Sequence, residues 1–329
     1  MKTLTFFNNK GGVGKTSLVY HLAWMFAERG VDTLALDLDP QANLTSMFLN
    51  NTQLETLWPD DAEHADTVFG AVRPILRGTG DIALPQPQVI RERLGLIAGD
   101  LGLSLFEDKL SDAWPRCGEG DEAAFRATTA FHRLVAEQHD TADKVVLIDI
   151  GPNLGAINRA ALIASDYIVM PLAADLFSLQ GLKNLGPTVR AWRKSWRDEK
   201  REKAPQALSI PQGNMQPIGY VVMQHGVRDK RPVKAYQRWI KHIPSAYREH
   251  VLNASSDPIP QIEDDPHNLA QLKHYHSLMP LAMEARKPMF HLRVADGAIG
   301  SQQEAVQTCY DDFRRLARKI AKQCAIALH

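Results

Sequence analysis

The sequence predicts an α/β protein built on a doubly wound, mostly parallel sheet. Short apolar segments recur along the chain, and stretches with helical spacing of apolar residues separate them. A glycine-rich loop joins the first of these segments to a helix, at the edge of the sheet where this fold class binds ligands. We expect strands over residues 3–7, 33–37, 143–150, 167–172 and 218–224.

The length of 329 residues accommodates one large domain or two ordinary ones. Hydrophobic residues make up 44% of the chain and charged residues 23%, which excludes wholesale disorder and a collagen-like structure. No apolar run approaches the ~20 residues that span a bilayer, and the first residues lack the layout of a signal peptide. Three widely spaced cysteines and twelve histidines show no disulfide or metal-binding spacing. We therefore expect a soluble cytoplasmic protein.

The first predicted strand, TLTFF, runs directly into the segment NKGGVGKTS at 9–17. Apolar residues then recur at roughly helical spacing until Gly30, at Leu18, Leu22, Ala23, Met25 and Phe26. Strand, glycine loop and helix are the context that favours a phosphate-binding loop. Glycines let backbone N–H groups curl around phosphate oxygens, and the helix N-terminus adds positive potential.

Lys15 and Thr16 close this loop and supply its chemistry. The Lys15 ammonium would reach the β- and γ-phosphates of a nucleotide, and the Thr16 hydroxyl would bind Mg²⁺. The general pattern GxxxxGK[ST] lacks its first glycine here, and Lys10 and Gly11 replace part of that spacing. A glycine-rich turn without a ligand is the alternative, which the flanking elements and the Lys-Thr pair disfavour.

The second predicted strand, TLALD, ends in the segment DLDPQAN, which carries Asp37 and Asp39. Taken alone, an aspartate at the end of a strand is often a helix cap or a turn former. Together, KGGVGKT and the DLDPQAN that follows about twenty residues later resemble the ParA/MinD family of deviant Walker P-loop ATPases.

This resemblance implies ATP/ADP as the nucleotide, Mg²⁺ as the cofactor ion and ATP hydrolysis as the reaction. Lys10 matches the signature lysine, which reaches across a nucleotide-sandwich homodimer to the partner's phosphates. Asp39 matches the residue that positions the attacking water, and Asp37 one that helps to organise Mg²⁺. Lys10, Lys15 and Asp39 are thus the expected catalytic residues. The loop residues expected to hold the nucleotide are Lys10, Gly11, Gly12, Val13, Gly14, Lys15, Thr16 and Ser17.

The strand predicted at 143–150 places Asp149 at its end. An aspartate there can hold a Mg²⁺-bound water, so Thr16, Asp37 and Asp149 are the expected metal residues. The family usually shows Asp-x-Pro-Pro here, whereas this chain has Asp149-Ile150-Gly151-Pro152. Many relatives end the strand at 218–224 with an asparagine that reads adenine, and Gln224 stands in that position as the expected base contact.

The resemblance weakens over 51–88 and 226–290, so we expect one ATPase domain over 1–329 with insertions at these two places. Because the first strand begins at residue 3, we do not expect an N-terminal helix-turn-helix domain. A last helix is predicted after Asp296–Ser301, with Phe313, Leu316 and Ile320 on its apolar face. Its end resembles a membrane-targeting helix, but the small, Ala-rich face favours packing against the core, so membrane binding is not expected.

The net charge is zero, because 38 Lys and Arg balance 38 Asp and Glu, yet the charges are unevenly distributed. Residues 190–203 include seven basic and three acidic side chains, and residues 228–248 include seven and one. A charged run is normally a solvated face. Two basic stripes in the half where relatives bind DNA favour contact with DNA phosphates without base reading. The expected DNA-binding residues are Arg190, Arg193, Lys194, Arg197, Arg201, Arg228, Lys230, Arg231, Lys234, Arg238 and Lys241.

We therefore expect a partition-type switch, in which ATP closes a homodimer that binds non-specific DNA. Slow hydrolysis, stimulated by an adaptor protein, would then release the dimer. A second hypothesis is a ParA-like regulatory ATPase that positions or controls another assembly, such as a polar, membrane-associated or defence complex. A third is a metabolic or redox enzyme of the same superfamily, but the three cysteines are not suitably placed for a shared iron–sulfur cluster.

Overall fold

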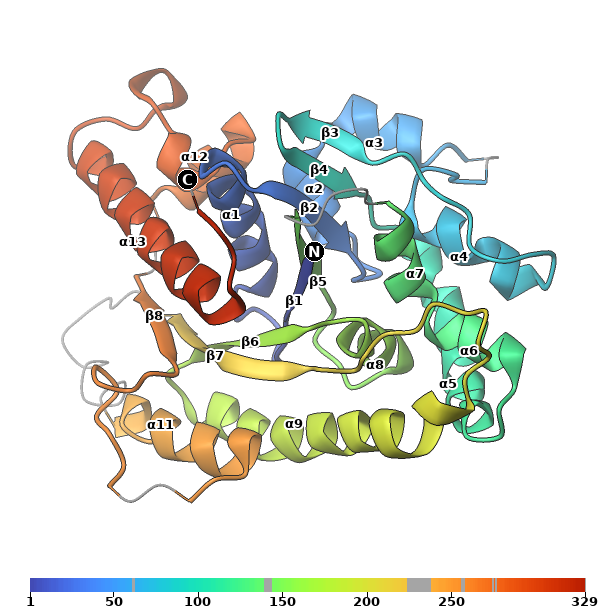
Figure 1. The fold of residues 1–329 in the computed structure, drawn as a ribbon. Helices are drawn as coiled ribbons and strands as arrows, with labels where there is room; N and C mark the ends of the chain where they lie inside the picture. The colour runs from blue at the N-terminus through green and yellow to red at the C-terminus, as the bar shows by residue number, and fades with distance from the viewer. Residues whose placement is uncertain are drawn as a thin grey trace.

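The computed structural model describes residues 1–60, 63–138, 144–223, 238–255, 258–273, 275 and 277–328. Within these ranges, eight strands form one sheet in the order β3-β4-β2-β5-β1-β6-β7-β8 (Figure 1). All neighbours pair in parallel except β3 and β4, which form an antiparallel pair at one edge. The predicted doubly wound, mostly parallel sheet is confirmed. The strands are β1 Lys2–Phe6, β2 Asp32–Asp37, β3 Gln88–Arg91, β4 Leu94–Ile97, β5 Lys144–Asp149, β6 Tyr167–Ala173, β7 Gln216–Met223 and β8 Asn268–Leu272.

Helices cover both faces of this sheet, and each face has its own hydrophobic core. One core holds α1 Lys15–Glu28, α2 Asn43–Phe48, α12 Met279–Ala285 and α13 Ser301–Cys324, with α3 Asn51–Leu57 at its border. The other holds α4 Val68–Arg77, α5 Phe106–Cys117, α6 Glu122–Thr128, α7 Ala130–Glu137, α8 Ala156–Ile163, α9 Leu176–Lys194 and α11 Ile243–Ala246. The helix α9 runs the length of its face beneath β6 and β7 (Figure 1).

The central strands are apolar on both sides because both sheet faces are covered. On β2, Leu34 and Leu36 point into one core while Ala35 points into the other. The five strands predicted from such runs all form, each within two residues of the expected bounds. The three that the sequence did not reveal, β3, β4 and β8, have only four or five residues each and lie toward the edges. Strand β8 lies inside 226–290, so part of that predicted insertion belongs to the sheet.

The helices α13 and α11 show how an apolar face and a proline are accommodated. The helix α13 packs Phe313, Leu316 and Ile320 into the same core as α1, which confirms the core-packing interpretation. Pro244 lies in the first turn of α11. A proline is tolerated in a first turn because its missing N–H has no intrahelical partner there.

All three cysteines are buried and free of disulfides. Cys117 lies in the core that contains α5, whereas Cys309 and Cys324 lie in the core that contains α13. Burial raises the pKa of each thiol. The three cysteines thus behave as small apolar residues of a packed interior.

Candidate functional site

The glycine loop at 9–17 connects β1 to α1 at the carboxyl edge of the sheet. Gly12 and Gly14 have φ values of 70° and 84°, in the left-handed region where a Cβ would cause strain. A Cβ on Gly14 would also lie 2.9 Å from the Cε of Met223. The loop and the first turn of α1 line a cavity, and a glycine loop at a helix N-terminus suits an anion.

Lys15 is the first residue of α1 and is only 7% exposed. Its Nζ donates to the carbonyl oxygen of Lys10 at 3.3 Å, so the side chain folds back under the loop. Burial lowers the pKa of Lys15, and the charges of Asp149 and Asp39 counteract part of that shift. A buried ammonium with one long hydrogen bond is well suited to bind a phosphate oxygen.

Asp37 and Asp149 end the adjacent strands β2 and β5, and the register of the ladder pairs them directly. Both side chains are fully buried. Asp37 accepts hydrogen bonds from the backbone N–H and the hydroxyl of Thr45, at 2.9 and 2.7 Å. Among the described residues, neither carboxylate oxygen of Asp149 has a hydrogen-bond partner. The Thr16 hydroxyl lies close enough to affect its pKa but falls short of hydrogen-bond geometry.

Within the part of the chain that the structure describes, this pair of buried carboxyl groups lacks enough positive charge to compensate two carboxylates. Burial raises the pKa of Asp37 to about 7, although the bonds from Thr45 oppose the rise. Burial and the neighbouring charge of Asp37 raise the pKa of Asp149 as well. A divalent cation would take the place of the retained protons, and carboxylate and hydroxyl oxygens are the ligands that Mg²⁺ prefers. Thr16, Asp37 and Asp149 therefore fit such an ion.

Asp39 lies just beyond β2 and is 8% exposed. Its Oδ1 accepts the N–H of Gln41 at 3.0 Å, which fixes the carboxylate. A Cβ on Gly151 would lie 3.3 Å from that same oxygen. The departure from Asp-x-Pro-Pro thus has a physical reason here, because Gly151 leaves room for the Asp39 side chain beside the loop that follows Asp149.

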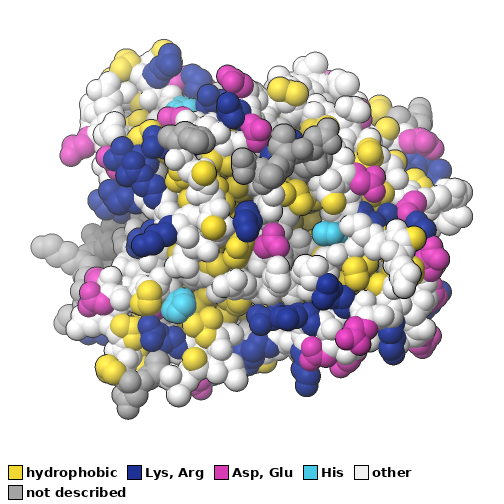
Figure 2. Space-filling view, viewed as in Figure 1, with side chains coloured by type: hydrophobic (Ala, Val, Ile, Leu, Met, Phe, Trp, Pro, Cys, Tyr) yellow, Lys and Arg dark blue, Asp and Glu magenta, His cyan; other side chains and the backbone are white. Residues whose placement is uncertain are grey.

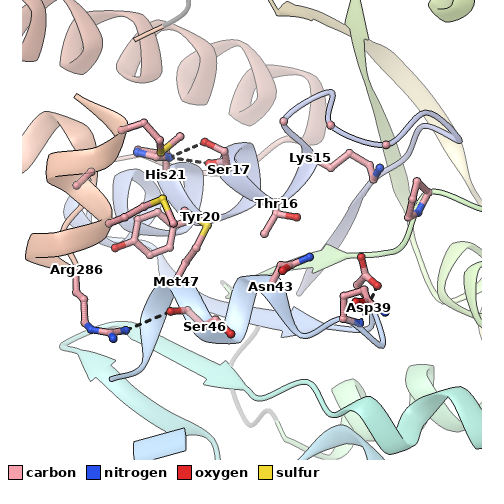
Figure 3. Close-up of a pocket in the computed structure, with 18 of the residues that line it drawn as sticks. Lys15, Thr16, Ser17, Tyr20, His21, Asp39, Asn43, Ser46, Met47 and Arg286 are labelled. Carbon is pink, nitrogen blue, oxygen red and sulfur yellow. Dashed lines mark hydrogen bonds between the residues drawn. The ribbon is translucent and has the colours of Figure 1, made fainter. Parts of the chain in front are cut away.

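A cavity of about 660 Å³ begins at this loop and continues along α1 (Figure 3). Lys15, Thr16 and Asp39 lie at one end, and Tyr20, Met47 and Arg286 line the other. Arg286 closes that end by donating to the carbonyl oxygens of Ser46, at 3.3 Å, and Leu49. The volume is within the range of about 300–1,000 Å³ that is typical of small-molecule sites.

A second cavity of about 110 Å³ lies on the other side of the loop, between Gly12–Gly14 and the ends of β7 and β8. Met223, Leu272 and Tyr275 line it. Gln224, the predicted base contact, follows Met223 directly but lies outside the described residues.

Lys10 lies apart from the 660 Å³ cavity. Its ammonium forms an ion pair with Asp175, the residue that caps the N-terminus of α9. The ammonium also lies 5.9 Å from the centre of the Phe177 ring, a side chain that is 73% exposed. In this structure Lys10 is therefore bound within its own subunit.

Sequence reasoning missed Asp175, Thr45 and Glu107. Thr45 orients Asp37, and Glu107 of α5 accepts the N–H groups of Ala156 and Ile157, which fixes the start of α8 just after the Asp149 loop. One signal was available for Asp175. It follows a parallel strand by two residues and precedes Ser178 by three, which is typical of a helix N-cap at the ligand-binding edge.

The basic residues predicted on 190–203 do not share one role. Arg193, Lys194 and Arg197 line a groove of about 680 Å³ between α9 and the Val251–Leu252 segment. Lys and Arg side chains gather along α9 at the lower part of the face shown in Figure 2. Arg190 also lines the groove, but it donates to the carbonyl oxygens of His250 and Val251, so it anchors the groove wall. Arg201 is half-buried beyond the end of α9.

The structure describes only part of the second predicted basic stripe, at 228–248. Arg228, Lys230, Arg231 and Lys234 lie outside the described residues. Arg238 and Lys241 are exposed, and the Arg238 guanidinium lies 5.0 Å from the centre of the Trp239 ring. Ile240, Ile243 and Tyr247 of the same segment are buried.

Within the described ranges, no helix combines the length and the apolar character needed to cross a bilayer. The same residues include no cluster of three or more His, Cys, Asp or Glu side chains placed to bind a metal. An ion at Asp37 and Asp149 would thus need further ligands, such as the Thr16 hydroxyl and phosphate oxygens.

Comparison with known proteins identifies relatives that include partitioning proteins. Residues 1–201 match the family model described as an AAA domain. Protein IncC of Escherichia coli is 35% identical over 190 residues, covering 57% of this chain and 46% of IncC. The chromosome partitioning protein ParA of Caulobacter vibrioides is 30% identical over 197 residues, covering 59% of this chain and 64% of ParA. The chain thus spans roughly half to two thirds of the length of these relatives.

Solved structures match over nearly the whole chain. A protein from Corynebacterium diphtheriae has a TM-score of 0.70 at 24% identity, covering 98% of this chain and 99% of its own. McdA from Cyanothece, in a complex with ATP, has a TM-score of 0.61 at 14% identity, covering 100% and 98%. At this level of identity the likeness establishes the fold.

Proposed function

Because the chain belongs to the ParA-like family of P-loop ATPases, we propose that it is an ATP-dependent dimerising switch that binds DNA without sequence preference. The observation that supports this most strongly is the buried pair Asp37 and Asp149 close to Lys15 and a phosphate-binding loop. A polyanion that carries a divalent cation would neutralise all three groups, and Mg²⁺–ATP has that chemistry.

In this proposal the phosphates bind the backbone N–H groups of the loop and the Lys15 ammonium. Thr16, Asp37 and Asp149 would hold Mg²⁺, which neutralises phosphate charge when bound. Thr45 keeps Asp37 oriented for that role through its two hydrogen bonds. Gln224 stays our prediction for the base contact.

Asp39 is our candidate for holding the attacking water. One of its oxygens is fixed by the N–H of Gln41, which leaves the other free to accept a hydrogen bond from water. Lys10 of a second subunit would complete the phosphate site, so hydrolysis requires the dimer. We propose that 1–329 acts as one ATPase domain and that an adaptor protein accelerates its slow hydrolysis.

The groove beside α9 is our candidate DNA surface. Arg193, Lys194 and Arg197 line it, and Arg238 and Lys241 are further exposed basic side chains. Positive charge alone supports contact with phosphates without base reading. Such a protein would act in the cytoplasm, on the nucleoid or a plasmid, as the names of its partitioning relatives suggest.

A titration of labelled duplex DNA with ATP, ADP and no nucleotide tests the proposal. We expect tight binding with ATP only, and an affinity that decreases steeply as salt is raised. Two duplexes of unrelated sequence serve as the control for sequence preference. Equal binding in all three nucleotide states contradicts a switch. An ATP-dependent dimer that ignores DNA favours a regulatory ATPase of another assembly.

A further inference from the structure

Lys10 and Asp175 link the phosphate-binding loop to the start of α9. The Lys10 ammonium donates to Oδ2 of Asp175, while Oδ1 accepts the N–H of Ser178 at 2.8 Å and caps the helix. Partial burial alone would raise the pKa of Asp175, but the bonds from Lys10 and Ser178 lower it instead. The carboxylate is therefore ionised at neutral pH and serves two donors at once.

The backbone on both sides of this ion pair is fixed. The Asn8 amide donates to the carbonyl oxygen of Pro171 at 2.6 Å and accepts the N–H of Lys10 at 2.9 Å. A Cβ on Gly181, in the second turn of α9, would lie 3.1 Å from Oδ1 of Asn9. The Lys10 and Asp175 side chains are nevertheless 30% and 31% exposed. The pair can thus break by side-chain rotation alone.

We propose that Asp175 is a positioning residue that holds the Lys10 side chain against its own subunit until a nucleotide phosphate competes for the ammonium. This inference rests on the proposed function, in which Lys10 binds a phosphate across the dimer. A carboxylate and a phosphate offer the same lysine the same kind of charge-assisted hydrogen bond. Asp175 consequently sets how much nucleotide is needed before Lys10 is released.

The expected size of the effect follows from the exposure of the pair. A partly exposed ion pair changes an equilibrium by about threefold, and a symmetric dimer breaks two such pairs, so removing both favours the dimer by about tenfold. Salt screens exposed charges, so the effect should shrink at high ionic strength.

Asp175→Asn separates the two roles of this side chain. Asparagine is as good an N-cap as aspartate, so the bond to Ser178 is kept while the charge that holds Lys10 is lost. Asp175→Ala removes both and should also lower the melting temperature. Glu304→Gln, an exposed site in the first turn of α13, is the control for loss of one negative charge elsewhere.

Sedimentation velocity with Mg²⁺ and the analogue AMPPNP measures the dimer. We expect Asp175→Asn to dimerise with a dissociation constant about tenfold below that of wild type, with Glu304→Gln unchanged. The difference between Asp175→Asn and wild type should diminish at about 0.5 M salt. Equal or weaker dimerisation of Asp175→Asn, beside a wild type that does dimerise, overturns the proposal.

The reactivity of Lys10 gives a second readout that needs no dimer. In the nucleotide-free chain, a small acylating reagent at low conversion should modify Lys10 several-fold faster in Asp175→Asn than in wild type, as followed by peptide mass spectrometry. Equal rates overturn the proposal. A wild-type chain that stays monomeric with AMPPNP contradicts the proposed function instead, so the two failures are distinguishable.

Discussion

The carboxyl edge of the sheet and the groove beside α9 are both charged, but they are built differently. At the edge, strand register places Asp37 and Asp149 side by side, and the loop after β1 brings Lys15 close to them. In the groove, the basic side chains come from one helix face, and their surroundings decide what each does. Arg190 is bound to carbonyl oxygens, while Lys194 and Arg197 are exposed.

The difference teaches how far a charge pattern can be interpreted. Backbone geometry fixes the distances among Asp37, Asp149 and Lys15, so their chemistry follows from where strands end. Helical spacing only places basic residues on one side of a helix. One of them can then donate to a nearby carbonyl oxygen and act as a structural residue. The first region should therefore respond to pH and to single substitutions, and the second to salt and to combined substitutions.

The largest expected effect is on hydrolysis. Asp39→Ala should lower the ATPase rate by about 1,000-fold, because a positioned carboxylate contributes a factor of that order, while ATP binding persists. Steady-state phosphate release, together with a nucleotide-binding titration, measures both quantities. A variant that hydrolyses ATP at the wild-type rate would show that Asp39 has no role in the reaction.

The next effect is on nucleotide affinity. Lys15→Ala should weaken ATP binding by about 100-fold, because it removes charge-assisted bonds made in a buried site. Calorimetric titration with ATP measures it, with Lys322→Ala on the exposed side of α13 as the matched control. An ATP affinity that is unchanged in Lys15→Ala would contradict the distinction between the two regions. The carboxyl edge of the sheet would then behave as an ordinary charged surface.

The carboxyl pair also predicts a pH dependence of stability. Asp37 keeps its proton to about pH 7 in the folded chain, against an ordinary pKa of 3.8, so folding takes up protons between these values. The free energy of unfolding attributable to Asp37 should therefore fall as the pH rises through this interval, by about 4 kcal/mol.

Asp37→Asn should remove that dependence, as denaturant unfolding at several pH values would measure. His21 acts in the opposite direction, because burial lowers its pKa to about 4 and its contribution is lost as the pH falls below 6.5. Subtracting the Asp37→Asn curve from the wild-type curve removes the His21 part and leaves that of Asp37 with its coupling to Asp149. A difference that rises with pH would contradict the burial argument.

The smallest effect belongs to the groove. Arg193→Glu with Arg197→Glu should weaken DNA binding by about tenfold and reduce the salt slope by about two, one for each lost phosphate contact. Fluorescence anisotropy at several salt concentrations measures both. Arg190→Gln is the matched variant, and we expect it to lower thermal stability more than the salt slope. If the double variant binds DNA as tightly as wild type does, the groove is not the DNA-binding surface.

The sequence predicted the site residues that follow directly from where a strand ends. It did not predict contacts between segments that are distant along the chain. Lys15, Asp37 and Asp149 follow recognisable strands, and parallel strands bring their carboxyl ends to one edge. The Asp175 contact needed the knowledge that β6 neighbours β1, which no local pattern contains. The partner of Arg190 comes from a segment sixty residues away. The strands β3 and β8 were missed because short edge strands have little apolar periodicity.

The burial of Cys117, Cys309 and Cys324 has a practical consequence for spectroscopy. A thiol with a raised pKa inside a packed core reacts slowly with maleimides, because the thiolate is the reactive form and needs access to the reagent. A single cysteine introduced at an exposed position, such as Val89, would then carry a fluorophore without removal of the native thiols. Distances between two subunits labelled in this way would follow dimer closure in real time.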